Sequence, residues 1–174
     1  DHMWLDGLQD AYDPDKKLMG CFAELAAKTL KISRESQDDF ARKSMEKALK
    51  AQKNGAFLQE IALILDKDEA MLQDEQPSES KLEKLSRLKP VFEKDGSITA
   101  GNASSIADGA ASLLMMSAEK AKQLGLKPLA KIKGMTGFAH SPEWFTTAPQ
   151  GSIERLLTQL RWKTSDVDLL SLIH

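Results

Sequence analysis

The chain is poor in cysteine and aromatic residues, and it has no long hydrophobic run. Its 174 residues include one cysteine, Cys21, which excludes an intramolecular disulfide and favours a reducing compartment. No apolar stretch approaches the roughly 20 residues that span a bilayer, and the first residues lack a signal-peptide charge pattern. We therefore expect a cytoplasmic protein, or one of an organelle matrix, with no membrane partner.

The sequence also lacks an excess of positive charge and the common catalytic motifs. Its net charge is −2, whereas a nucleic-acid-binding protein usually carries a basic face, so no nucleic-acid partner is expected. The motifs GxGxxG, GxxxxGK[ST], GxSxG and HExxH are absent. His2, His140 and His174 do not have the spacing of metal ligands with each other or with Cys21, and no metal site is expected.

What is present is typical of a globular chain, with 41% hydrophobic and 29% charged residues. A helix is predicted over residues 19–30, where Phe22, Leu25, Ala26 and Leu30 share one face. Cys21 lies within this pattern, and a lone cysteine in a helix is more often a packed residue than a nucleophile.

Two further helices are predicted in the first hundred residues. One begins at Ser33, whose hydroxyl can cap it, and ends at Gly55. The other covers residues 80–90 and ends at a proline. Residues 57–64 are short and apolar enough for a strand, although their spacing is also compatible with a helix.

The remainder of the chain alternates between helix and strand patterns. Asp108 can cap an apolar helix over 109–125, whose first half should be buried. A strand over 128–135, a helix over 152–162 and a buried strand over 166–173 follow. This order is typical of a layered α/β fold.

One short segment is locally basic, with Lys81, Lys84, Arg87 and Lys89 around the helix predicted at 80–90. Such a cluster is either a solvated helix surface or a surface that faces phosphate groups. The solvated surface is the more common case and is the favoured interpretation.

The stretch GSITAGNASSIADGAASLLMMS, residues 96–117, contains almost no side chain larger than leucine. It resembles the segment that follows the loop domain of the thiolases, the acetyl-CoA acetyltransferase family, where the pattern is close to GTVTAGNASGxxDGAAALLLMS. LDGLQDAYD, ISRESQDDFARKS and LEKLSRLKPVFEKDG agree with the family in order and spacing. The resemblance extends from residue 2 to about residue 169.

The resemblance implies an incomplete thiolase-like α/β fold that corresponds to the central segment of the family. Residues 1–106 would form the mostly helical, coenzyme-A-binding loop domain. Residues 107–127 would be a buried helix of the N-terminal thiolase half. Residues 128–174 would begin a truncated C-terminal half with a partial layered α/β structure. The boundary between two subdomains is expected near residues 100–107.

In the family, the small-residue bend lines the tunnel for the pantetheine arm of coenzyme A. The resemblance implies that the Ser104 hydroxyl hydrogen-bonds an amide of the arm. It also implies that Ala100, Ala103 and Ile106 line the tunnel.

Four more residues are implied in the same pocket. Phe92 would pack near the adenine end, and Leu18 and Met19 would form a wall, although many relatives have histidine in place of Leu18. Phe145 stands where many relatives have a methionine near the coenzyme. For Phe92 and Phe145, ordinary core packing is an equal alternative. Ser105 replaces the more usual glycine.

The catalytic groups of the family are expected outside this sequence. Thiolase chemistry needs a nucleophilic cysteine, an activating histidine and a second cysteine, and Cys21, His140 and His174 match none of them. We expect no catalytic residue here, no permanently bound cofactor, and coenzyme A or acyl-CoA as substrate. The family pattern ends after Leu169, and Ile173 stands where the family has an asparagine that positions a catalytic water.

Two functional hypotheses follow from the resemblance. The chain is a segment of a thiolase-family acyltransferase, which condenses or thiolyses 3-ketoacyl-CoA, or it is a non-catalytic module of a split or decayed thiolase. An unrelated helical adaptor is disfavoured by the number of matched motifs. Because elements of the fold would lack neighbours, a homo-oligomer or association with complementary thiolase segments is expected.

Overall fold

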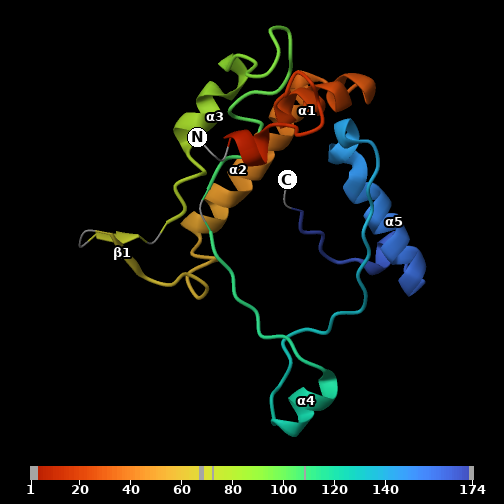
Figure 1. Cartoon of the computed structure of the whole chain (residues 1–174). Coiled ribbons are helices and arrows are strands. Elements are labelled where there is room, and N and C mark those ends of the chain that lie inside the picture. The colour runs from red at the N-terminus through yellow and green to blue at the C-terminus, as the bar shows by residue number, and fades with distance from the viewer. Residues whose placement is uncertain (1–3, 67–68, 72, 108, 173–174) are drawn as a thin grey trace. The chain divides into compact units, whose positions relative to one another are not determined.

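The chain forms two compact units, Asp1–Ser105 (unit 1) and Ile106–His174 (unit 2). The computed structural model describes residues 4–66, 69–71, 73–107 and 109–172. Helices account for most of the regular structure in these residues (Figure 1). The division into units falls within the segment 100–107. Before it the sequence patterns are mainly helical, and after it helix and strand patterns alternate.

Unit 1 contains helices and one small hairpin. In chain order its elements are η1 (Trp4–Leu8), α1 (Met19–Thr29), α2 (Arg34–Lys53), β1 (Ile64–Asp66), β2 (Glu69–Met71), α3 (Glu79–Lys84) and η2 (Leu85–Arg87). Strands β1 and β2 pair antiparallel, with Leu65 opposite Ala70. The sheet is thus local, since its two strands are neighbours in the sequence.

The helix predicted over 19–30 is present as α1, but only part of its apolar face is buried. Phe22 and Ala26 are buried, whereas Leu25 is partly exposed and Leu30 is mostly exposed. The carboxylate of Glu24 is completely buried on the same helix. A polar side chain therefore occupies a place in the interior that the apolar spacing does not reveal.

The start and end signals of α2 are confirmed. The Ser33 hydroxyl accepts a hydrogen bond from the backbone N–H of Ser36 at 3.2 Å, as an N-cap does. The helix ends at Lys53 with Asn54 as its C-cap, and Gly55 follows with a φ of 67°, a conformation that glycine adopts without strain. The predicted helix over 80–90 is present as α3 and η2, and the Ser78 hydroxyl caps α3.

The strand predicted over 57–64 is wrong for most of its length. Residues 54–60 form successive turns, in which Ile61 N–H donates to the carbonyl of Phe57 at 3.1 Å. A strand needs a partner for its backbone groups, and here the pairing begins only at Ile64. The apolar run did not predict the local structure correctly, because a short run of this kind does not by itself distinguish a strand from other structures.

Unit 2 contains α4 (Ala118–Gln123), η3 (Pro142–Thr147), α5 (Ala148–Leu160) and η4 (Thr164–Asp166). Helix α5 confirms the predicted helix over 152–162 and starts four residues earlier, with Pro149 in its first turn. It packs on an extended segment, where the Thr136 hydroxyl donates to the carbonyl of Ser152 at 3.0 Å. Figure 1 shows this segment running alongside α5.

The long buried helix predicted over 109–125 is wrong. Only α4 is helical, and the Ser117 hydroxyl caps it by accepting from the N–H of Lys120 at 3.1 Å. Residues 109–116 lie outside helices and strands and are exposed, and the predicted cap Asp108 lies outside the described residues. An apolar stretch that is hydrophobic all round gains little from forming a helix when no surface covers it.

The two strands predicted in unit 2 are not formed in the described part of the chain. Residues 128–135 and 167–172 lie outside strands and are mostly exposed, and Ile173 is beyond the described range. Extended backbone becomes a strand only when a neighbour pairs with it. The layered α/β arrangement therefore stays a prediction, as does the assignment of these residues to two thiolase halves.

Candidate functional site

A hollow of about 580 Å³ lies in unit 1 beside the small-residue bend. We call it the bend hollow. It is formed by α2, the segment 74–77, α3 and the bend 100–105. Its lining consists of Phe40, Ala41, Ser44, Met45, Ala48, Asp74, Gln76, Pro77, Lys81, Lys84, Leu88, Ala100, Gly101, Asn102, Ala103, Ser104 and Ser105.

Three of the residues singled out from the sequence line the bend hollow. Ala100, Ala103 and Ser104 stand on the bend, and both Ala100 and Ser104 are exposed. Because these side chains are small, the backbone of the bend is open to a molecule in the hollow. The serine hydroxyl is available there as a donor and an acceptor.

A second group of singled-out residues lies around the start of α1. The Phe92 ring packs directly against Gly20, so closely that a β-carbon at Gly20 would collide with the ring. Met19 precedes Gly20 and is half-buried, and Leu18 forms a backbone bridge with Gln9. None of Leu18, Met19 and Phe92 lines the bend hollow, and their roles stay predictions.

The remaining two residues belong to unit 2. Ile106 is exposed, and Phe145 is half-buried in η3. Their roles at the site stay predictions.

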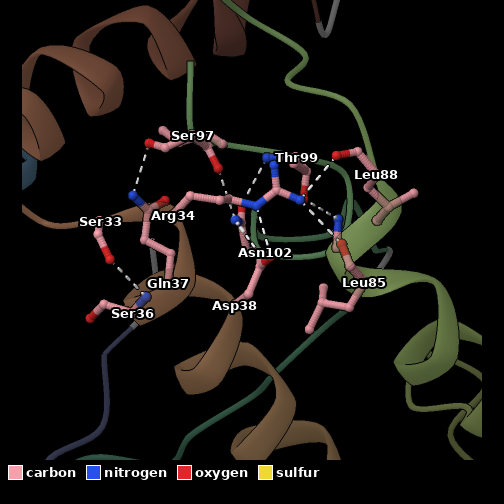
Figure 2. A network of polar contacts seen from close by, with 12 residues as sticks. Ser33, Arg34, Ser36, Gln37, Asp38, Leu85, Leu88, Ser97, Thr99 and Asn102 are labelled. Atoms are coloured by element: carbon pink, nitrogen blue, oxygen red, sulfur yellow. Dashed lines mark hydrogen bonds and ion pairs between the residues drawn. The ribbon is translucent and has the colours of Figure 1, made fainter. Parts of the chain in front are cut away.

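A polar network that the sequence analysis missed holds the bend (Figure 2). The carboxylate of Asp38 accepts from Asn102 Nδ2 at 2.9 Å and from Arg34 Nε at 2.7 Å. Asn102 also donates to the carbonyl of Ser97 at 3.0 Å, and its Oδ1 accepts from the N–H of Thr99 at 2.7 Å. The bend is thereby tied to α2.

Arg34 connects the same carboxylate to the segment after α3. One guanidinium nitrogen donates to the carbonyl of Leu88 at 2.9 Å and to that of Leu85 at 3.2 Å. These carbonyls lie near the end of a helix, where a cation is favourable. The backbone of the bend also lies close to the side chains of Leu85 and Leu88. A β-carbon on Gly101 would stand 2.5 Å from Leu85 Cδ1 and 2.7 Å from Leu88 Cδ1.

Glu24 anchors the beginning of the bend from α1. Its oxygens accept from the N–H of Ile98 at 2.7 Å, from the N–H of Ser97 at 2.8 Å and from the Ser97 hydroxyl at 3.0 Å. A carboxylate with no exposure needs such donors, because leaving it unpaired is costly. The one signal in the sequence is a glutamate between two apolar positions of a predicted helix face.

Two of the four clustered basic residues border the bend hollow. Lys81 and Lys84 line it and are exposed, whereas Arg87 and Lys89 are exposed elsewhere. The ammonium group of Lys81 donates to the carbonyl of Gln76 at 2.6 Å. The two lysines outnumber the one acidic residue of the lining, Asp74, so the charge of the lining favours an anionic ligand.

Another hollow, of about 590 Å³, has a different character. Phe57, Leu58 and Ile61 contribute to its lining, which contains no basic side chain and none of the residues singled out from the sequence. The bend hollow is therefore the better candidate for a polar, charged ligand.

Neither a metal-binding cluster nor a membrane-spanning helix is present in the residues that the structure describes. Among them, no group of three or more histidine, cysteine, aspartate or glutamate side chains is arranged to hold a metal ion. In the same residues, every helix is too short or too polar to cross a membrane. Cys21 is half-buried in α1 and is a free thiol.

Comparison with known sequences gives a consistent set of matches. A family model described as "Thiolase, N-terminal domain" matches residues 1–119. A probable acetyl-CoA acyltransferase of Staphylococcus aureus strain COL is 41% identical over 99% of this chain and 45% of its own length. Acetyl-CoA acetyltransferase 2 of Arabidopsis thaliana is 44% identical over 97% of this chain and 43% of its own length.

Solved structures agree with the sequence matches. The acetyl-CoA acetyltransferase of Bacillus anthracis has a TM-score of 0.83 and 40% identity over 93% of this chain and 42% of its own. The acetyl-CoA acetyltransferase of Syntrophomonas wolfei has a TM-score of 0.83 and 34% identity over 95% of this chain and 42% of its own. The chain thus spans less than half the length of the relatives it matches.

Proposed function

Because the chain belongs to the thiolase family, we propose that it supplies the coenzyme-A-binding surface of an acyltransferase. The reaction class is the Claisen condensation or thiolysis of 3-ketoacyl-CoA, with an acetyl-CoA acetyltransferase as the type. The bend hollow carries the proposal, since it combines a bare bend with two lysines in one space of about 580 Å³. No permanently bound cofactor is part of the proposal.

The bend would hold the pantetheine arm of the coenzyme. This arm is thin and contains two amide groups, so it needs close access to the protein and a few hydrogen-bonding partners. Ala100 and Ala103 would give that access, and the Ser104 hydroxyl would pair with one amide. Leu18, Met19 and Phe92 of unit 1 would contact the coenzyme at other points. For Ile106 and Phe145 of unit 2, a coenzyme contact is proposed from the family resemblance alone.

The lysines would face the phosphate groups of the coenzyme. Lys81 and Lys84 line the bend hollow from α3, and each ammonium group offers three donors and a positive charge. For Lys81 and Lys84 we thus propose contact with phosphate groups, in place of the solvated helix surface that the sequence favoured. Arg87 and Lys89 keep that interpretation.

The chain would bind and orient the substrate, and the acyl transfer would use groups outside it. Transfer needs a thiolate nucleophile and a base within hydrogen-bond reach of each other. Cys21 is half-buried in α1, and His140 Nε2 lies 2.7 Å from the carbonyl oxygen of Trp144 in unit 2. We assign a catalytic role to neither. A homo-oligomer, or association with complementary thiolase segments in the cytoplasm, is part of the same proposal.

Isothermal titration of the 174-residue chain with coenzyme A tests the binding role. Ser104→Ala should weaken binding by about two- to tenfold, the value of one hydrogen bond. Ser36→Ala changes a serine on α2 that does not line the hollow and should leave the affinity unchanged. The absence of saturable binding to the unaltered chain would contradict the proposal.

A turnover assay tests the division of labour. The chain alone should not thiolyse acetoacetyl-CoA, whereas mixing it with the complementary segments of a thiolase relative should restore activity. Turnover by the chain alone that disappears in Cys21→Ala would refute the assignment. Binding without turnover in the mixture would favour the non-catalytic module instead.

A further inference from the structure

We propose that Asp38 is a positioning residue, which sets the conformation of the bend 100–105 and thereby the affinity of the bend hollow for the pantetheine arm. The inference rests on the proposed function for its ligand and on the polar network of Figure 2 for its mechanism. Asp38 itself does not line the hollow.

Both oxygens of the Asp38 carboxylate are engaged, each by a different part of unit 1. Oδ1 accepts from Asn102 on the bend at 2.9 Å, and Oδ2 accepts from Arg34 at 2.7 Å. The Asp38 side chain is 15% exposed, so water competes little with these partners. Hydrogen bonds that involve a charged group are stronger than neutral ones.

The carboxylate also decides which way the Asn102 amide points. In the observed orientation Nδ2 donates to Asp38 and to the carbonyl of Ser97, and Oδ1 accepts from the N–H of Thr99. The reversed orientation would place Oδ1 against two acceptors and Nδ2 against a donor. One orientation therefore closes the turn from Thr99 to Asn102, two residues before Ser104.

Through Arg34, the same carboxylate fixes a second wall of the hollow. The guanidinium holds the carbonyls of Leu85 and Leu88 while its Nε donates to Asp38. Leu88 lines the hollow, and its carbonyl is one of the two that Arg34 holds. Asp38 thus connects α2, the segment after α3 and the bend through one group.

The next residue provides a matched control. Asp39 is also an aspartate of α2, but its carboxylate pairs with Arg42 and Lys43 on the exposed surface of the same helix. Asp39→Asn removes the same charge from the same helix without touching the bend. Any effect specific to the network must therefore appear in Asp38→Asn and not in Asp39→Asn.

Asp38→Asn keeps the size of the side chain and removes one acceptor. Its amide nitrogen must face a donor, either Arg34 Nε–H or Asn102 Nδ2–H, so one side of the link is lost. We expect coenzyme A to bind about tenfold or more weakly, and Asp39→Asn to stay within about twofold.

A shortened ligand separates positioning from general destabilisation. Adenosine 3′,5′-bisphosphate carries phosphates for the lysines but has no pantetheine arm to contact the bend. Its affinity should be equal in Asp38→Asn and the unaltered chain. Equal loss for both ligands, or no loss for coenzyme A, would overturn the inference.

Hydrogen exchange provides a measurement that does not need the ligand. The Thr99 amide donates to Asn102, and it should exchange about tenfold faster in Asp38→Asn than in Asp39→Asn. If the unaltered chain does not bind coenzyme A, the proposed function fails and this exchange rate alone decides the positioning role. Equal exchange in the two variants would overturn it.

A second variant covers a failure of Asp38→Asn to fold. Asn102→Ala removes the bend's side of the link and leaves the pair of Arg34 with Asp38 in place. It should reproduce the loss for coenzyme A and the unchanged affinity for the bisphosphate. Unchanged binding of both ligands would count against the inference.

Discussion

At the scale of single residues, polar side chains in the interior shape unit 1 as much as apolar ones do. Glu24 and Thr99 are completely buried, and both serve the segment that leads into the bend. Among the described residues of this unit, the buried apolar side chains are Phe22, Ala26, Ala27, Leu85 and Ile98. Substitutions of the polar groups should therefore be unusually costly.

Glu24→Gln should destabilise the chain by about 1–3 kcal/mol. The new amide places a donor against the N–H groups of Ser97 or Ile98, and a buried donor without an acceptor costs this much. Urea unfolding measures the change. Glu46→Gln alters an exposed ion pair with Arg42 on α2, and it should cost less than about 1 kcal/mol. Similar losses in the two variants would contradict the role of Glu24.

Gly101→Ala should destabilise by about 1–3 kcal/mol, because the added β-carbon meets the methyl groups of Leu85 and Leu88. Gly137→Ala adds the same atom where nothing lies within 4 Å, and it should be nearly neutral. Thermal unfolding of the two variants checks the difference. An unchanged midpoint for Gly101→Ala would show that the bend can move away from the leucines.

At the scale of elements, the start of α2 couples its cap to a titratable group. The pKa of Glu35 is held below its ordinary value, first by a hydrogen bond from its own backbone N–H and then by one from the Ser33 hydroxyl. A carboxyl group with a lowered pKa in the folded state stabilises that state above the ordinary pKa. The contribution is lost as the pH falls through the lowered value.

Ser33→Ala should cost about 1 kcal/mol of stability and raise the pKa of Glu35 toward its usual value. The pKa should stay below that value, because the backbone N–H remains. An NMR titration of the side chain follows the shift. Ser117→Ala is the control, since it should raise the pKa of Glu119 at the start of α4 and leave Glu35 unchanged. No movement of Glu35 in Ser33→Ala would contradict the coupling.

The sequence was a good guide where an element depends on its own residues. Ser33 and Gly55 mark the start and end of α2, and both signals act within a few residues of themselves. The partial burial of α1 and the exposure of Leu30 could not be predicted, because burial depends on which segment packs against a helix.

The sequence was a poor guide where an element depends on distant partners. The stretches 109–116 and 128–135 have no strand partner among the described residues, and neither periodicity nor composition supplies one. At the site, the small residues of the bend could be singled out from their pattern. The network of Arg34, Asp38 and Asn102 could not be predicted, because Asp38 and Asn102, which are hydrogen-bonded to each other, are 64 residues apart in the sequence.

At the scale of the whole chain, large apolar side chains are exposed throughout unit 2. Leu113, Leu114 and Leu129 are more than four-fifths exposed. Exposed apolar groups in this number favour association, because removing their surface from water lowers the free energy. The 174-residue chain should therefore self-associate as its concentration rises, and sedimentation velocity should show the change.

Charged substitutions test which surface drives that association. Leu113→Glu with Leu114→Glu should shift the chain toward the monomer. Gln123→Glu with Gln159→Glu adds the same charge at exposed polar positions, and it should leave the association unchanged. If both double variants shift the chain equally toward the monomer, the added negative charge is the cause and the apolar segment is not.

The extended segments of unit 2 also determine where a protease can enter. A peptide bond must enter a protease active site as extended chain. The lysines of α2 are therefore poor cleavage sites, because they lie within helical turns. Lys131 and Lys133 are exposed on a stretch outside helices and strands, whereas Lys127 precedes a proline and is not a trypsin site. Brief trypsin digestion should cut there first and release a fragment that retains α1, α2, α3 and the bend. That fragment would carry the bend hollow intact.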